Sequence, residues 1–139
     1  MSETPLVGLV LVSHSREVAE SVARLARGLA GGGVLAPVEP AGGTPDGGLG
    51  TSSEAIAAAA RRADRGAGVA VLADLGSAVL TVQALLAEDA GEGELPQDTR
   101  LVDAPFLEGA VAALVAASAG AGLDAVAAAA GEAYTFRKV

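Results

Sequence analysis

The sequence predicts an α/β fold, a doubly wound and mainly parallel sheet of four strands with helices on both faces. Short apolar runs alternate along the chain with longer stretches of helical periodicity, and clusters of glycine, serine or proline separate them. The first apolar run, Leu6 to Val12, is nearly continuous, which indicates a strand covered on both faces. We expect the strand order 2-1-3-4, which places the first and third strands side by side.

Composition indicates a single domain, residues 1–139, with a core between about residues 6 and 133. Hydrophobic residues make up 51% of the sequence but aromatic residues only 2%, so we expect a thin core of small side chains. The net charge of −8 argues against nucleic acid as a partner, because the sequence offers no basic stripe to neutralise phosphates.

Chemistry that needs cysteine is excluded, since the sequence contains none. With a single histidine, a metal site would have to be built mostly from carboxylates, so we predict no metal and no cofactor. Residues 1–5 carry no basic region, and the apolar run after them is too short for a signal peptide or a membrane span. We therefore expect a soluble, cytoplasmic protein.

The first strand leads into a helix that begins after Ser15, a suitable N-cap, and ends near Leu29. Three glycines at residues 31–33 end this helix, and residues 34–38 are predicted to form a second strand. Pro37 suggests that this strand lies at an edge of the sheet. Helical spacing predicts that the inner face of the helix consists of Val18, Val22, Leu25 and Leu29.

A glycine-rich loop, residues 40–50, precedes a second helix at residues 55–65. Thr51 and Glu54 have the spacing of a capping box, which predicts the start of this helix. Glycines followed by hydroxyls at a helix N-terminus favour an anion site, although most such loops are only surface excursions. No lysine follows the last glycine, Gly50, so the loop is not a Walker A motif and ATP binding is not expected.

The third strand, residues 69–73, repeats the plan of the first. It ends in Asp74, and Ser77 is predicted to cap a helix at residues 78–88. A plain turn residue is the alternative interpretation of Asp74. Next we expect an acidic loop at residues 89–99, a strand at 100–102, and two helices starting near Pro105 and Leu123, before a frayed end at 137–139. The inner face predicted for the first of these helices consists of Leu107, Val111, Leu114 and Ser118.

His14 is the only histidine and follows the first strand directly. In a parallel sheet the carboxyl ends of the strands open onto the ligand crevice, so the ends of strands one and three bring His14 and Asp74 to one edge. The alternative is a surface histidine at a turn. A carboxylate beside the imidazole would fix its tautomer and leave the other ring nitrogen as a nucleophile.

Four segments in the expected order resemble the mannose-family enzyme IIA fold. These are residues 9–15, which contain the Ser13-His14-Ser15 motif, the glycine loop 41–52, and residues 73–78 and 104–110. The match spans about residues 7–131 and is closest to the phosphotransferase subunit of the dihydroxyacetone kinases that use phosphoenolpyruvate. Each motif is modest evidence, but the ordered set is specific.

The resemblance implies a phosphotransferase that works through phosphohistidine. His14 would accept a phosphoryl group from the phosphocarrier protein HPr and pass it to the ADP-bearing subunit of the kinase. Some relatives carry fused HPr-like and enzyme I-like domains after this one. The 139-residue sequence is too short to include them, so we expect the donor to be a separate protein. The resemblance also implies a homodimer. Asp74 would orient His14, and the predicted phosphate-binding residues are Ser13, Ser15, Gly50, Thr51, Ser52, Gly76 and Ser77.

Two other functions remain open. One is the related enzyme IIA component of a sugar permease, although residues 74–77 and the glycine loop favour the kinase relay. The other is a non-catalytic module that senses an anion. Such a module needs no nucleophile, so replacement of His14 would leave its binding intact.

Overall fold

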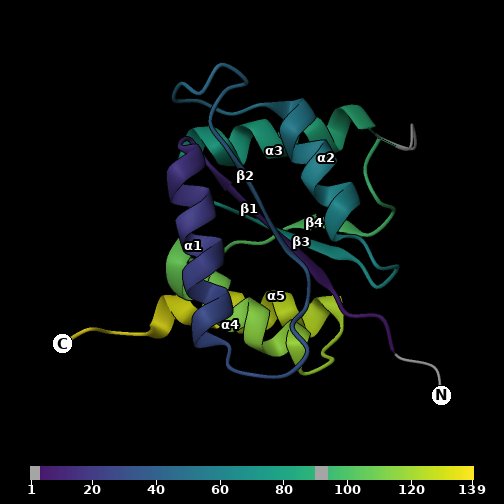
Figure 1. Cartoon of the computed structure of the whole chain (residues 1–139), viewed down its shortest axis with the longest axis vertical. Coiled ribbons are helices and arrows are strands. Elements are labelled where there is room, and N and C mark those ends of the chain that lie inside the picture. The colour runs from purple at the N-terminus through teal and green to yellow at the C-terminus, as the bar shows by residue number, and fades with distance from the viewer. Residues whose placement is uncertain (1–3, 90–93) are drawn as a thin grey trace.

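The computed structural model describes residues 4–89 and 94–139, and it confirms the predicted fold class (Figure 1). The four strands are parallel and lie in the order β2-β1-β3-β4. The elements are β1 (Gly8–Ser13), α1 (Arg16–Leu29), β2 (Val38–Gly42), α2 (Ser53–Ala63), β3 (Val69–Ala73), α3 (Gly76–Asp89), β4 (Thr99–Leu101), α4 (Phe106–Ser118), α5 (Leu123–Glu132) and the 3₁₀ turn η1 (Ala133–Thr135).

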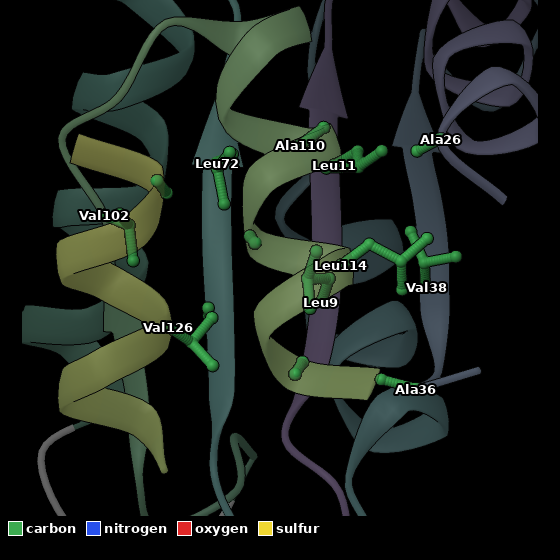
Figure 2. Close-up of a cluster of buried hydrophobic side chains, with 14 of the residues drawn as sticks. Leu9, Leu11, Ala26, Ala36, Val38, Leu72, Val102, Ala110, Leu114 and Val126 are labelled. Carbon is green, nitrogen blue, oxygen red and sulfur yellow. The ribbon is translucent and has the colours of Figure 1, made fainter. Parts of the chain in front are cut away.

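The central strand β1 is buried along its whole length and serves both layers of the core. Leu9 and Leu11 point to the face that α1, α4 and α5 cover, whereas Val10 and Val12 point to the face that α2 and α3 cover. Figure 2 shows Leu9 beside Leu114 and Leu11 beside Ala110, both of α4, a helix that packs over the strand. The continuous apolar run in this strand therefore reflects helices packed on both sides of the sheet, as the sequence predicted.

Small residues let the helices approach the sheet closely. The helix α2 buries mostly alanines, and the carbonyl oxygen of Ala63 lies where a side chain on Gly8 would begin: an added Cβ would be 2.0 Å from it. Helix α4 contacts β3 in a similar way, because a Cβ at Gly109 would be 3.2 Å from Leu72. The thin core predicted from composition thus corresponds to short helix-to-sheet distances.

Several predicted boundaries were wrong by a few residues. The second strand begins at Val38, where the predicted strand ended, because Leu9 in β1 pairs with Val38 and not with the residues before it. Its edge position is confirmed, and Pro40 lies within it, where an edge strand tolerates the missing N–H. The fourth strand begins at Thr99, one residue early. Of the predicted acidic loop, residues 90–93 lie outside the described residues.

The predicted inner faces of two helices were also wrong in part. Helix α1 buries Ala19, Ala23 and Ala26, while Val18, Leu25 and Leu29 are 44, 46 and 61% exposed and Val22 is half-buried. The alanines face the sheet because only small side chains fit at this separation. In α4, Leu114 is buried as predicted, Val111 and Ser118 are half-buried, and Leu107 is exposed.

The exposed residues of α1 and α4 form an apolar groove of about 660 Å³. Phe136 from the C-terminal segment extends this groove, and a Glu108–Lys138 ion pair lies at its edge. Its lining side chains include Leu25, Leu29, Leu107, Val111, Val115 and Phe136.

The contact between Gly8 and Ala63 makes Gly8 a sensitive position. We expect Gly8→Ala to lower the free energy of unfolding by about 1–3 kcal/mol, because α2 must move away from β1 to admit one methyl group. Gly28→Ala is the matched control, since a Cβ there meets nothing within 4 Å and Gly28 lies in a helix. It should be neutral or stabilising by up to about 1 kcal/mol. Urea denaturation measures the free energy of unfolding of both variants. Equal changes in the two would contradict the close packing of α2 against Gly8.

Candidate functional site

His14 and Asp74 lie side by side at the carboxyl edge of the sheet, each directly after its strand. Strands β1 and β3 are hydrogen-bonded neighbours, and the ladder continues one step beyond β3, where the Asp74 N–H donates to the Val12 carbonyl at 3.0 Å. Two side chains that are 60 residues apart in sequence are thereby held on adjacent strand ends.

The Asp74 carboxylate accepts four hydrogen bonds. Its Oδ1 accepts from the His14 ring nitrogen Nδ1 at 3.0 Å and from the Leu75 N–H at 2.7 Å. Its Oδ2 accepts from the Ser13 hydroxyl at 2.8 Å and from the His14 N–H at 3.1 Å. The carboxylate therefore joins the end of β1, the His14 ring and the start of the β3–α3 turn.

These contacts keep Asp74 ionised. Partial burial of the carboxyl raises the pKa of Asp74, but the hydrogen bonds from Ser13, from the backbone and ring of His14, and from Leu75 outweigh it and hold the pKa below its ordinary value of 3.8. An ionised carboxylate can only accept hydrogen bonds. The bond to Nδ1 therefore requires that Nδ1 carries a proton.

A neutral His14 ring protonated on Nδ1 has its lone pair on Nε2. The Ser77 hydroxyl lies 2.5 Å from Nε2 and can donate to this lone pair. The His14 side chain is 25% exposed and that of Asp74 is 17% exposed, so the ring is held from the sheet side and open on the other. Chemically, the arrangement is an oriented imidazole nucleophile covered by one movable hydroxyl.

The glycine loop supports the backbone of His14. The Gly50 N–H donates to the His14 carbonyl at 2.8 Å, and the Gly43 N–H donates to the Ser13 carbonyl at 3.3 Å. A Cβ on Gly42 would lie 2.4 Å from the Ser15 carbonyl oxygen, so only glycine allows this approach. The Gly50 N–H is thus engaged by the His14 carbonyl, and phosphate binding at Gly50 stays a prediction.

The predicted hydroxyls divide into two groups. Ser13 and Ser77 contact the Asp74–His14 pair directly. Ser15 and Ser52 act as N-caps, because their hydroxyls accept from the N–H groups of Val18 and Ala55 at 3.3 and 3.2 Å.

The cap of α2 is therefore Ser52, one residue later than the capping box predicted. Thr51 contacts Thr81 of α3 at 3.0 Å, and Thr81 donates to the Ser77 carbonyl, which ties the start of α2 to α3. Helix α3 begins at Gly76, so Ser77 lies inside its first turn and does not cap it.

Sequence reasoning missed two contributors to the site. The Leu75 N–H shares the Asp74 oxygen that binds the ring, and Thr81 joins two helices behind Ser77. The position of Thr81, four residues after Ser77 on a helix, was the available signal for the second. Across residues 4–89 and 94–139, no three His, Asp or Glu side chains cluster closely enough to hold a metal ion. None of the helices in these ranges is long and apolar enough to cross a membrane.

The fold and the site define a small doubly wound α/β domain that carries an oriented histidine at the carboxyl edge of a 2-1-3-4 sheet. The chain belongs to the EIIA-man family: the family pattern described as "PTS system fructose IIA component" matches residues 8–127. This finding confirms the resemblance inferred from the four sequence motifs.

Similar proteins agree with this assignment. A protein of Listeria innocua named "PEP-dependent dihydroxyacetone kinase 2, phosphoryl donor subunit DhaM" is 33% identical over 110 residues, which cover 79% of this chain and 85% of the relative. The subunit of the same type from Escherichia coli is 34% identical over 122 residues, which cover 87% of this chain. The match spans only 25% of the Escherichia coli protein.

Solved structures support the fold. A crystal structure of a protein of unknown function superposes with a TM-score of 0.76 at 31% identity, covering 92% of this chain and 95% of the other. A sigma-54 interaction domain protein from Enterococcus faecalis superposes with a TM-score of 0.57 at 16% identity, covering 89% of this chain and 87% of that one, a likeness of fold alone.

Proposed function

We propose that this chain is a phosphohistidine relay protein, in which His14 accepts a phosphoryl group from HPr and passes it to the ADP-bearing subunit of a dihydroxyacetone kinase. The observation that carries the proposal is the His14–Asp74 pair, which leaves Nε2 as the nucleophilic nitrogen at the open edge of the sheet. The relatives named as phosphoryl donor subunits of such kinases support this choice of partners. These partners place the relay in the cytoplasm.

In the first step, the His14 Nε2 lone pair attacks the phosphorus of the donor phosphohistidine. A new N–P bond forms as the donor's N–P bond breaks, and the donor nitrogen leaves with the bonding electron pair. The proton on His14 Nδ1 stays in place, and the charge that develops on the ring is balanced by the Asp74 carboxylate. In the second step, a terminal phosphate oxygen of ADP attacks the same phosphorus, and Nε2 leaves with its electron pair.

Ser77 changes partner during this cycle. Its hydroxyl covers Nε2 at 2.5 Å before transfer, so it must rotate away as the phosphoryl group arrives. It then lies beside the phosphoryl oxygens and can donate a hydrogen bond to one of them. In this proposal, Ser77 binds the phosphoryl group together with backbone N–H groups at the starts of α2 and α3.

The chain also forms a homodimer in this proposal, and the apolar groove between α1 and α4 is the contact. A net charge of −8 opposes self-association over most of the surface. The groove is different, because it is apolar and two of its charged residues, Glu108 and Lys138, pair with each other. Glu132 is the one charged lining residue outside this pair, so a second copy that covers the groove faces little like charge.

The names of the relatives favour the kinase relay over an enzyme IIA of a sugar permease.

Labelling tests the nucleophile. With phosphoenolpyruvate, enzyme I and HPr, the chain should gain one acid-labile, alkali-stable phosphoryl group, because His14 is its only histidine. His14→Gln should abolish the label without unfolding the domain, whereas Ser52→Ala should keep it, since Ser52 serves as a helix cap. An acid-stable label on Thr51 or Ser52, or strong labelling by ATP without carrier proteins, would contradict the assignment. Binding of an anion that survives His14→Gln, without labelling of the wild type, would favour the sensing module.

Removal of the Asp74 charge tests the orientation of the ring. Asp74→Asn should slow phosphoryl transfer by at least about 10²-fold, because the amide NH2 can donate to Nδ1 and favour the other ring tautomer, and the amide carries no charge to balance the ring. The ¹⁵N shifts of the single imidazole should show a smaller fraction of the Nδ1–H tautomer. Asp124→Asn, on a carboxylate paired with Arg100, is the control and should leave both unchanged. If Asp74→Asn has the transfer rate and the ring tautomer of the wild type, Asp74 is only a turn residue.

Sedimentation equilibrium tests the dimer. The wild type should have twice the 13.4 kDa mass of one chain, and Leu25→Asp should yield a monomer, because it places a charge in the groove. Val18→Asp is the matched control, since Val18 is a similarly exposed residue of α1 outside the groove, and it should remain dimeric. A monomeric wild type would contradict the dimer, and a dimeric Leu25→Asp variant would exclude this groove.

A further inference from the structure

A second hollow opens beside the His14 site, between the ends of β3 and β4. The hollow has a volume of about 550 Å³, and its near wall is formed by Asp74, Leu75 and Gly76, at the turn between β3 and α3. Its far wall is formed by Asp103, two residues after the end of β4, and by Tyr134 of η1. The hollow therefore joins the carboxyl edge of the sheet to the C-terminal turn.

Asp103 and Tyr134 form a polar pair in this wall. The Tyr134 hydroxyl donates to Asp103 Oδ1 at 2.7 Å. This hydrogen bond, with smaller contributions from burial and the negative charge of Asp103, raises the pKa of Tyr134 above its ordinary value of 10.0. The phenol therefore stays protonated near neutral pH, and its oxygen keeps a lone pair that can accept from an additional donor.

The two carboxylates of the hollow differ in what they can still accept. Asp74 already receives four hydrogen bonds from Ser13, His14 and Leu75. Asp103 receives only the bond from Tyr134 among the described residues, and this bond uses one of its two oxygens. Asp103 therefore supplies the acceptor capacity of the hollow, which has no cationic residue in its lining.

The absence of cationic residues from the lining of the hollow is important because a phosphoryl group is negatively charged. A phosphoryl group on His14 would bring negative charge next to Asp74 and within the same edge as Asp103, where like charges repel. Arg16, the first residue of α1, is the cationic residue nearest to His14 in sequence, and it lines a different hollow, with Gly42 and Gly43. Elsewhere in the described chain, four cationic side chains form ion pairs, namely Arg61–Glu94, Arg62–Glu39, Arg100–Asp124 and Lys138–Glu108. The other four, Arg24, Arg27, Arg65 and Arg137, do not line the hollow either.

We propose that Asp103 and the Tyr134 hydroxyl form a socket for a guanidinium or ammonium side chain of the protein that donates the phosphoryl group to His14. The inference rests on the proposed function. A cation in the socket binds the free Asp103 oxygen and the Tyr134 oxygen, while the apolar walls, Val79 and Leu101, contact its aliphatic stem. From there it offsets the negative charge of the transferring group, so docking and charge balance are supplied by the same side chain.

Two phosphoryl donors separate docking from chemistry. Phosphoramidate is too small to use the socket, whereas phosphorylated HPr must dock as a protein. Asp103→Asn should raise the half-saturating concentration of phosphorylated HPr about tenfold or more, because a charge-assisted contact is lost. The saturating rate and the rate with phosphoramidate should stay within about twofold of the wild type. The dependence of the HPr rate on salt should also become weaker, since one attractive charge pair is removed.

Two further variants complete the test. Tyr134→Phe should raise the same concentration by a smaller factor, because the charge of Asp103 remains. Asp98→Asn makes the same charge change at the other end of β4, where the Asp98 carbonyl accepts from Val69, and it should have no effect. An Asp103→Asn variant that matches Asp98→Asn, or that slows labelling by phosphoramidate equally, would overturn the socket. A wild-type His14 that neither donor labels would instead contradict the proposed function itself.

Discussion

The Asp74 carboxylate is the point on which the candidate site depends. It accepts from the side chain of Ser13, from the backbone and ring of His14, and from the backbone of Leu75, so one group fixes the exit of β1 and the exit of β3 together. Its lowered pKa and its effect on the ring have the same origin, since the donors that favour the charged carboxylate include Nδ1–H itself. Loss of this charge would therefore disturb both the ring tautomer and the turn that carries Ser77.

This carboxylate can act only because the strands that carry it are placed accurately. Gly8 admits the Ala63 carbonyl against β1, and Gly42 admits the Ser15 backbone against the edge strand. The first contact fixes the amino end of β1 against α2, whereas the second contact and the Gly50 N–H on the His14 carbonyl hold the His14 turn itself. The abundance of glycine and alanine, which gives a thin core, is thus also the means by which the site is positioned.

The strand runs and the residues at their ends were predictable from the sequence, because burial of β1 and β3 on both faces leaves a strong apolar signal and parallel strands end at one edge. Helix orientation was less predictable. In α1 the large residues Leu25 and Leu29 suggested the inner face, but the alanines occupy it, since hydrophobicity alone does not encode how close a helix lies to its sheet. Backbone contacts such as Gly50 to His14 leave no side-chain pattern at all, so the role of the glycine loop as a support could not be predicted.

The scarcity of cations at this edge fits the proposed phosphoryl relay. A site that surrounds a phosphoryl group with arginine and lysine binds it tightly in the ground state and so raises the barrier to its release. Here the Ser77 hydroxyl lies beside Nε2, and Asp74 and Asp103 are carboxylates of the same sheet edge, which would disfavour retention of an anion. In the proposed relay, positive charge supplied by a transient partner would stabilise the phosphoryl group only while that partner is bound. Such a site would favour exchange of the phosphoryl group over its retention.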